Sequence, residues 1–481
     1  MKKITSVLLA VIMMFSLCTT AFAQAEQPAK AYNGDPVIIV RGIHFGGLVH
    51  ADGSYALVFN SDDITALLKK MLGDLLKGDE DFFVGNLIAY LQKVFDPIAS
   101  DNEGKSLHLD VHMSKYDLSL DHYGIKKENW TRSESGLACD AAEEFGGENV
   151  YFFTYDWRKS PLELSDELHF FIEKVKAEKN SAKVDLAACS MGGMVATAYL
   201  YEYGNSSVDS LVYLSSAHNG THIAGAALTG DIHTSGEYLY TYVEDLVSDK
   251  PDALKLLVKA ARFTGIFDFA AMLLNAFVET NKERVYNELL RDYLGTSLGL
   301  WGLCTDADFD NSVEFVFGSC KDKYPVIIDE LAKIKTFVCS TEETIENAKN
   351  NGTKISFVSH YNSKVLPIYE ETMEQSDAVL ECDLTSNYAT FAEFGKTLTE
   401  SHISSVNAEY ISPDKMVDAS TCLYKDSTWF IKDAPHVGCR VDSDHANLAL
   451  WLISSEAQPT VTMNPLYPRF IAVDSEMNFI N

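Results

Sequence analysis

The chain has 481 residues, of which 69 are acidic and 39 are basic, and its formal net charge is −30. A surface this acidic repels nucleic acids and anionic membranes, so we expect no nucleic-acid partner. The length is sufficient for one large catalytic domain that carries substantial insertions.

The N-terminus has the pattern of a secretory signal peptide. Two lysines precede an apolar stretch, and Ala-Phe-Ala at residues 21–23 forms a small-x-small cleavage site. The apolar stretch is too short to favour an uncleaved membrane anchor. We therefore predict a signal peptide over residues 1–23 and a soluble, secreted product.

Apolar runs alternate with helical patterns along the rest of the chain. This alternation is typical of a mostly parallel sheet with helices on both faces. Helices are predicted over residues 162–179 and 445–453, and the second of them closes the fold. The predicted strands cover residues 37–40, 150–154, 184–190, 211–214, 355–358 and 428–431. The last two of them should complete the sheet.

Two intervals are much longer than the usual connections of α/β units, and we predict that both are cap or lid insertions on the catalytic face. The first holds helical patterns over residues 64–76 and 82–95. The predicted parts are a signal peptide (1–23), a first part of the core (24–221, with an insertion over about 48–147), a cap or lid (222–352) and a second part of the core (353–481).

Residues 263–277, in the second insertion, are apolar nearly all round if they form a helix. Two interpretations are open for this segment. It is either a helix buried in the core of a cap, or a lid or acyl-chain wall whose apolar surface faces a lipid.

The most informative motif surrounds Ser190. An apolar run from Val184 ends in this serine, and a helical pattern follows at once. This is the sequence form of a nucleophile elbow, in which a strand turns sharply into a helix. The turn crowds the positions two before and two after the serine, and Ala188 and Gly192 are both small. The elbow also directs the Met191 N–H at the reaction centre, where it can stabilise an oxyanion. The simpler interpretation is a buried strand followed by a helix.

A nucleophilic serine needs a base, and the base needs an acid that orients it. In this architecture both follow the serine along the chain, and the acid comes first. Asp377 lies in a turn after the strand predicted over residues 355–358 and is the preferred acid. Asp383 and Asp418 are the alternatives, although each is also compatible with a solvated loop charge.

The preferred base is His436. It follows the strand predicted over residues 428–431 and precedes the closing helix, so it can reach back over the serine. His445 lies already inside the closing helix, and it remains an alternative together with His402.

A second oxyanion donor is expected from a backbone N–H in the loop after the first strand. Gly42 permits a close backbone approach there, and Ile43 is the preferred donor, with His44 as the neighbouring alternative. The chain has no His-Glu-x-x-His, Cys-x-x-Cys or phosphate-binding glycine pattern. We therefore predict neither a metal nor a cofactor.

Three segments resemble, in this order, the lecithin:cholesterol acyltransferase-like branch of the α/β-hydrolases. They are Pro-Val-Ile-Ile-Val at residues 36–40, Tyr-Asp-Trp-Arg-Lys-Ser-Pro at residues 155–161, and the elbow around Ser190, whose leading alanine also resembles some bacterial secreted lipases. The resemblance implies an α/β-hydrolase fold and a lipid ester as substrate. It also implies Ser190 as nucleophile, Asp377 as acid and His436 as base.

The Asp156-Trp157-Arg158 run within this motif has two interpretations of its own. The preferred one is a buried ion pair beside a tryptophan that braces the loop under the elbow. The other is a wall for the head group of the substrate.

Together these features predict a secreted serine esterase or lipase that works through an acyl-enzyme and makes transient contact with a lipid interface. The close alternative is an O-acyltransferase that passes the acyl group to an alcohol. Two further alternatives are peptidase or thioesterase chemistry on the same triad and a non-catalytic binding protein on the same fold.

Overall fold

The computed structural model describes residues 34–58, 80–124, 134–246, 252–364, 375–436 and 443–480. The predicted signal peptide and the helical pattern over residues 64–76 lie outside these described residues.

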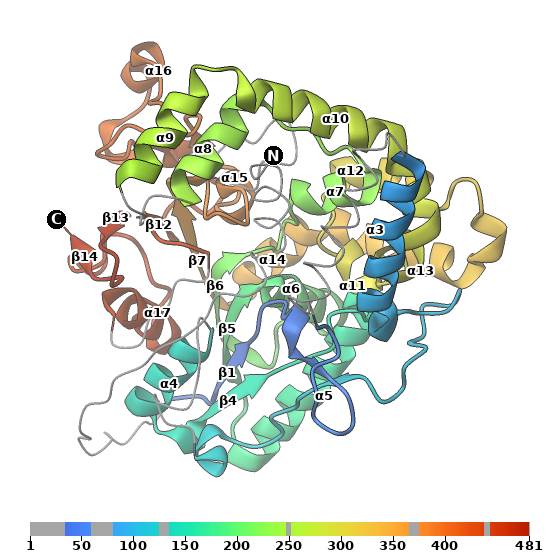
Figure 1. The fold of residues 1–481 in the computed structure, drawn as a ribbon. Helices are drawn as coiled ribbons and strands as arrows, with labels where there is room; N and C mark the ends of the chain where they lie inside the picture. The colour runs from blue at the N-terminus through green and yellow to red at the C-terminus, as the bar shows by residue number, and fades with distance from the viewer. Residues whose placement is uncertain are drawn as a thin grey trace.

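An eight-stranded sheet runs through the middle of the molecule (Figure 1). Its neighbouring strands are parallel except for the last pair, in which β14 runs antiparallel to β13. This sheet with its flanking helices confirms the predicted α/β-hydrolase-like fold. In spatial order the strands are β14 (Phe479–Ile480), β13 (Phe470–Val473), β12 (Thr428–Lys432), β7 (Lys354–Tyr361), β6 (Val208–Ser216), β5 (Val184–Ser190), β1 (Val37–Val40) and β4 (Val150–Phe153).

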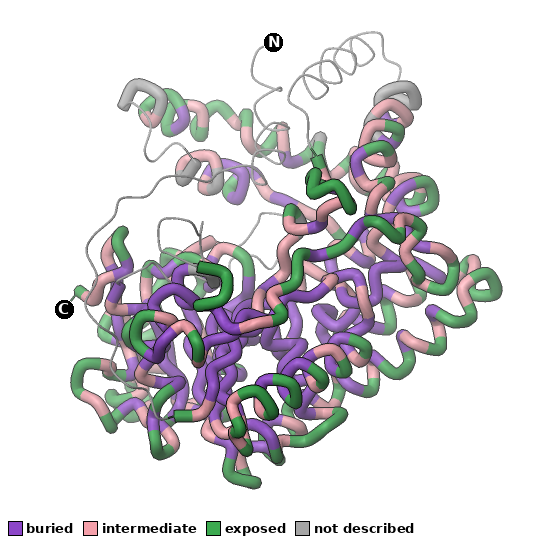
Figure 2. Tube along the Cα trace, turned by 90° about the horizontal axis from the view of Figure 1, so that it is seen from below, coloured by how far each residue is buried: buried purple, intermediate pink, exposed green. Residues whose placement is uncertain are grey.

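Each face of the sheet packs into its own hydrophobic core. On β1, Ile38 and Val40 join one core, whereas Val37 and Ile39 join the other. Because both faces are covered, all four residues of β1 are apolar and buried. Buried residues accordingly gather in the interior of the molecule (Figure 2). The helices that contribute to the first core are α5 (Pro161–Lys179), α6 (Met191–Tyr203) and α14 (Thr341–Asn350), and those of the second are α4 (Glu134–Phe145) and α17 (Asp444–Ser454).

The expectation that residues 428–431 form the last strand is wrong. After α17 the chain adds β13, in which Phe470 pairs with Phe430 of β12, and then β14 at the edge. These strands have only four and two residues. Apolar runs this short, between turn residues, are too weak to be recognised in a sequence.

The interval between β6 and β7 forms a helical cap with a hydrophobic core of its own around Trp301. Its last helix, α14, returns to the sheet. The cap elements before it are α7 (His222–Thr229), α8 (Gly236–Leu246), α9 (Asp252–Arg262), α10 (Ile266–Val285), the π-helical η6 (Tyr286–Gly295), α11 (Leu298–Trp301), α12 (Asp306–Phe317), η7 (Lys321–Lys323) and α13 (Pro325–Cys339).

The interval between β1 and β4 divides between the cap and the sheet. Its helix α3 (Glu80–Phe95) packs Val84 and Ile88 against Leu289 of the cap, whereas α4 covers the sheet. Short elements complete this interval: η1 (Phe45–Gly47), β2 (Leu48–Val49), η2 (Asp96–Ile98), β3 (His112–Met113), η3 (Leu120–Tyr123) and η5 (Gly147–Asn149).

Short elements also connect β7 to β12. They are β8 (Ser363–Lys364), β9 (Gln375–Ser376), α15 (Cys382–Thr385), β10 (Thr390–Phe391), α16 (Glu400–Ser405), η8 (Ala408–Tyr410), β11 (Val417–Asp418) and η9 (Ala419–Thr421).

The segment over residues 263–277 is not a buried helix. Within α10, Ala271 is buried, but Phe269 and Met272 are 58% and 56% exposed. In Figure 1, α8, α9 and α10 form a layer at the top of the view, on the opposite side of the molecule from β1 and β4. Apolar side chains are therefore exposed on this layer. Within the described residues, no helix combines the length and the apolar character needed to cross a membrane.

Candidate active site

Ser190 lies at the tip of the turn between β5 and α6. Its backbone has φ 50° and ψ −127°, a region that residues with a side chain adopt only when the surrounding structure holds them there. The serine is 6% exposed, and Cys189 before it is fully buried. This strained conformation is the one that a nucleophile elbow requires.

The glycines that follow the serine let α6 approach the sheet. A Cβ on Gly192 would stand 2.4 Å from the carbonyl oxygen of Val40, and one on Gly193 would stand 1.6 Å from Oγ of Ser216. Only glycine is compatible with contacts this close. The start of α6 is therefore fixed against β1 on one side and β6 on the other.

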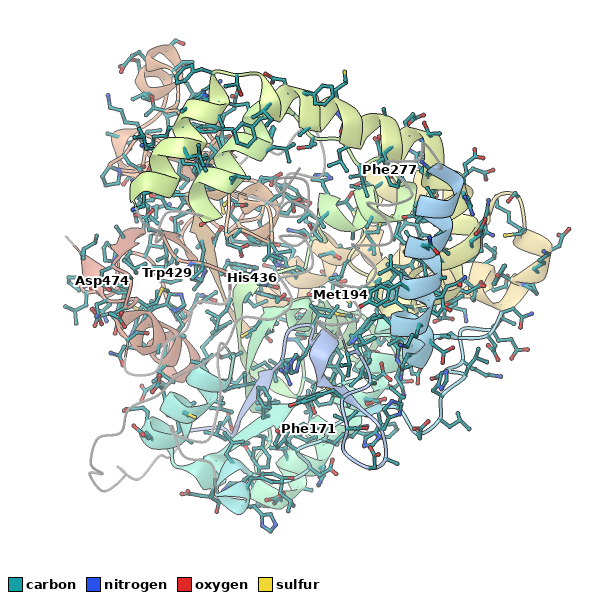
Figure 3. All side chains as sticks on the ribbon, in the orientation of Figure 1. Phe171, Met194, Phe277, Trp429, His436 and Asp474 are labelled. Carbon is teal, nitrogen blue, oxygen red and sulfur yellow. The ribbon has the colours of Figure 1, made fainter. Side chains whose placement is uncertain are left out.

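The structure brings Ser190, Asp377 and His436 together. Nε2 of His436 lies 2.9 Å from Oγ of Ser190, and Nδ1 lies 2.7 Å from Oδ2 of Asp377. An ionised carboxylate only accepts, so the Nδ1–H donates to Asp377 and Nε2 is left to accept from the serine hydroxyl. In Figure 3, His436 lies between the sheet and the layer of α8, α9 and α10. The arrangement can remove a proton from Ser190.

Asp377 is held as a carboxylate although it is only 1% exposed. Burial raises the pKa of this carboxyl, but the charge and hydrogen bond of His436 and the backbone bond from Leu380 outweigh burial and lower the pKa below its usual value. The N–H groups of Val379 and Leu380 donate to Oδ1 at 2.9 and 2.7 Å. Oδ2 is thereby left for the histidine.

The alternative acids and bases have other partners or positions. Nε2 of His402 lies 2.8 Å from Oδ2 of Asp418, so these two alternatives pair with each other. Asp383 lies in the first turn of α15. His445 is in α17, where its Nε2 lies 2.7 Å from Nε2 of His360.

The two predicted oxyanion donors belong to segments that meet beside the serine. Met191 is the first residue of α6, and Ile43 is half-buried in the segment after β1. The hydroxyl of Tyr155 donates to the carbonyl of Arg41 at 2.8 Å, and the N–H of Arg41 donates to Phe153 at 3.2 Å. These bonds fix the start of the segment that carries Ile43.

Arg158 forms a brace between three parts of the chain. Its Nη2 donates to Oδ2 of Asp156 at 2.6 Å and to the carbonyl of Val111 at 3.1 Å, and its Nη1 donates to Pro97 at 3.3 Å. The guanidinium is 6% exposed. This geometry favours the bracing interpretation over a wall for a substrate head group.

Sequence reasoning missed two buried histidines near the triad. His218 follows β6 and bonds Oδ1 of Asn387 through Nε2 at 3.0 Å, and burial lowers its pKa to about 4. His360 lies near the end of β7 and bonds the loop that carries His436. A single histidine beside an apolar strand forms no motif, so the sequence held no signal for His360, whereas His218 lies within the Ser-Ser-Ala-His-Asn-Gly-Thr turn at residues 215–221, after the fourth predicted strand.

Among the residues that the structure describes, no three histidine, cysteine, aspartate or glutamate side chains are grouped so that they could hold a metal ion.

No protein-family model matches the chain, and no curated protein matches its sequence. Among solved structures, a chain of the crystal structure of the Tle4-Tli4 complex is similar at 12% sequence identity, with 88% of this chain and 98% of that chain covered. With a TM-score of 0.32, this similarity gives no information about function.

Proposed function

We propose that the protein is a serine hydrolase, a secreted esterase or lipase that cleaves lipid esters through an acyl-enzyme. The observation that carries this proposal is the chain of hydrogen bonds from Asp377 through His436 to Ser190, built on a strained elbow. The sequence motif and the described fold both support the same chemistry.

In the first half of the proposed reaction, Oγ of Ser190 attacks the ester carbonyl carbon while Nε2 of His436 takes the hydroxyl proton. Asp377 stabilises the imidazolium that results. The oxyanion accepts hydrogen bonds from the N–H groups of Met191 and Ile43. When the intermediate collapses, the C–O bond to the alcohol breaks and His436 returns its proton to the leaving alkoxide.

In the second half, His436 takes a proton from water, and the hydroxide formed adds to the carbonyl carbon of the acyl-enzyme. The bond to Oγ of Ser190 then breaks, and Oγ recovers its proton from His436. The products are a carboxylic acid and an alcohol. If an alcohol replaced water in this half, the same steps would transfer the acyl group to it.

The exposed apolar side chains of α9 and α10 support a lipid substrate. Soluble proteins rarely gather such side chains on one surface without a binding role. We infer that this surface, which we call the lid surface, touches the lipid interface transiently during catalysis. It comprises Leu256, Leu257, Phe263, Ile266, Phe269 and Met272, whose exposed fractions lie between 42% and 88%.

A fluorophosphonate probe and a chain-length series of p-nitrophenyl esters test the proposal. The wild type should be labelled and should hydrolyse esters, whereas Ser190→Ala should do neither. Ser401→Ala, an exposed serine in α16, is the matched control and should behave like the wild type. Labelling that persists in Ser190→Ala, or turnover of peptide amides without turnover of any ester, would contradict the proposal.

Product analysis separates hydrolysis from acyl transfer. With a lipid ester as donor, we expect the free acid as the main product both with and without a sterol or glycerol. An acylated sterol or glycerol as the main product would instead make the protein an acyltransferase.

Export is tested separately. The mature protein recovered from the medium of the producing cells should begin at Gln24, because the small-x-small site ends at Ala23. Retention inside the cells with an intact N-terminus would contradict secretion.

A further inference from the structure

His360 is a buried histidine that the proposed reaction does not use. It lies near the carboxyl end of β7 and is 1% exposed. Its Nδ1 lies 2.9 Å from the carbonyl oxygen of Pro435 and 2.8 Å from Oγ of Ser215. Its Nε2 lies 2.7 Å from Nε2 of His445 in α17. Both ring nitrogens are therefore occupied.

The carbonyl of Pro435 decides where the hydrogens of this pair lie. A carbonyl oxygen only accepts, so the bond to Pro435 requires a hydrogen on Nδ1 of His360, and Oγ of Ser215 then accepts from the same N–H. Burial lowers the pKa of His360 to about 4 and lowers that of His445 well below its ordinary value, so both rings are neutral near pH 7. Nε2 of His360 therefore has a lone pair, and Nε2 of His445 donates its hydrogen to it.

The bond to Pro435 matters because the next residue is the base of the proposed triad. The segment before His436 is fastened to the end of β7 at two further points. The N–H of Asp433 donates to the carbonyl of Tyr361 at 3.0 Å, and Nδ2 of Asn362 donates to Oδ1 of Asp433 at 2.6 Å. The imidazole of His436 thus takes its position from residues 360–362.

The same end of β7 holds the loop that carries the acid. The N–H of Asn362 donates to Oε1 of Gln375 at 2.9 Å, and Oγ of Ser376 donates to the carbonyl of Ser363 at 3.0 Å. Asp377 follows directly. The distance between the acid and the base is therefore set by one short stretch of strand.

We propose that His360 is a positioning residue for His436, and that His445 holds it in the Nδ1–H tautomer. This inference rests on the proposed function, because it assigns His436 as the base. His360 touches no reacting atom; it fixes the Pro435 carbonyl and with it the direction of the catalytic imidazole. Misplacement of a catalytic group by about 1 Å costs on the order of 100-fold in rate.

Two polar substitutions separate the two nitrogens of His360. In His360→Asn, the amide nitrogen is attached to Cγ, as Nδ1 is, and can still donate to Pro435. In His360→Gln, the amide is one bond further out and can meet His445 but not the carbonyl. The proposal predicts that the Asn variant retains activity within about threefold, whereas kcat of the Gln variant falls about 10- to 100-fold.

The kinetic readouts distinguish positioning from general stability. With a soluble p-nitrophenyl ester, the Gln variant should lose kcat while KM changes by less than about twofold, because substrate contacts are intact. The rates are compared for protein that is folded by near-UV circular dichroism. Equal kcat values for the Asn and Gln variants, or a loss that appears only in KM, would overturn the inference.

Failure of this inference is distinguishable from failure of the proposed function. If Ser190→Ala abolishes labelling and turnover but His360→Gln is fully active, the proposed function stands and His360 is only structural. If Ser190→Ala is still labelled and active, the proposed function itself fails.

The tautomers can be measured on the wild-type protein, so the inference stays testable if a variant does not fold. Nitrogen-15 chemical shifts of the histidine rings should show the hydrogen on Nδ1 of His360 and on Nε2 of His445. A hydrogen on Nε2 of His360 instead would overturn the inference.

Discussion

Gly192 and Val40 approach so closely that a Cβ on the glycine would stand 2.4 Å from the carbonyl oxygen of the valine. The atom in the way belongs to the backbone of β1, which is paired on both sides, and it cannot move aside as a side chain can. This contact holds the start of α6 against the end of β1. The two segments that carry Met191 and Ile43 therefore keep a fixed relation to Ser190.

Gly192→Ala should consequently displace the elbow. We expect a loss of stability of about 1–3 kcal/mol and a large loss of esterase activity, because a methyl group is forced into a filled site. Thermal melts and ester hydrolysis measure the two effects. The control is Gly85→Ala in α3, where the nearest atom is the end of the Arg284 side chain at 3.4 Å. Full activity of Gly192→Ala would show that the elbow tolerates movement.

Asp377→Asn should lower kcat by roughly 10,000-fold, because an amide in place of the carboxylate favours the wrong tautomer of His436. Asp383→Asn is the matched control, since this residue lies only six positions further on, in α15. It should keep kcat near that of the wild type. A collapse of kcat in Asp383→Asn beside a mild effect in Asp377→Asn would reverse the assignment of the acid.

The free energy of unfolding should fall as the pH drops from about 6.5 to 4. His218 and His360 are neutral when folded, and burial lowers the pKa of each to about 4. In the unfolded chain each of these histidines binds a proton near pH 6.5, whereas in the native state it does so only near pH 4. Acid therefore favours unfolding. Each histidine contributes up to roughly 3 kcal/mol to this loss.

Denaturant titrations at several pH values measure this dependence. His218→Gln keeps a polar group toward Asn387 but cannot titrate, so its stability should fall less steeply between pH 6.5 and 4 than that of the wild type. His233→Gln, at a position that is only partly buried, serves as the control for the substitution itself. A slope that is the same in all three proteins would show that His218 is not buried as a neutral ring.

Arg158→Lys should destabilise the protein by about 2 kcal/mol, because a lysine cannot reproduce the fork of bonds that reaches Asp156, Pro97 and Val111. Arg262→Lys is the same substitution in an exposed pair with Glu237 and should cost less than about 1 kcal/mol. Chemical denaturation compares them. A change of KM that depends on the head group of the ester would instead support the substrate-wall interpretation.

Replacing Phe269 and Met272 together by serine should reduce activity on emulsified long-chain esters by at least about fivefold, because apolar area that contacts the interface is removed. Activity on a soluble short-chain ester should stay within about twofold of the wild type, since the triad is untouched. Phe170→Ser on α5, 71% exposed and distant from the lid surface, is the control. An equal loss on both substrates would contradict contact between the lid surface and lipid.

The central sheet could be predicted because the signal for each strand lies in consecutive residues of the chain. Val37 to Val40 must all be apolar, as both faces of β1 are covered. The elbow at Ser190 was recognisable because the turn imposes small residues at fixed positions. The order of acid and base then restricted the search to a few residues, among which Asp377 and His436 were preferred. In the structure His436 bonds both Ser190 and Asp377, and the catalytic roles of these residues remain proposals.

Other features were not predictable, since they depend on contacts between distant segments. Nothing near His360 in the sequence indicates that Pro435 and His445 will flank it. The apolar pattern of residues 263–277 shows that a helix has apolar faces but not which of them is covered. Phe269 is exposed only because no other segment of the described chain covers it.

Residues 360–363 fasten both the segment before Asp377 and the segment before His436. The chain between the two loops therefore does not have to hold them at a fixed separation. Insertions or deletions around α16, which has no buried residue, should leave the relation between the two side chains undisturbed. Variation among natural homologues should therefore concentrate there, while the last residues of β7 change little.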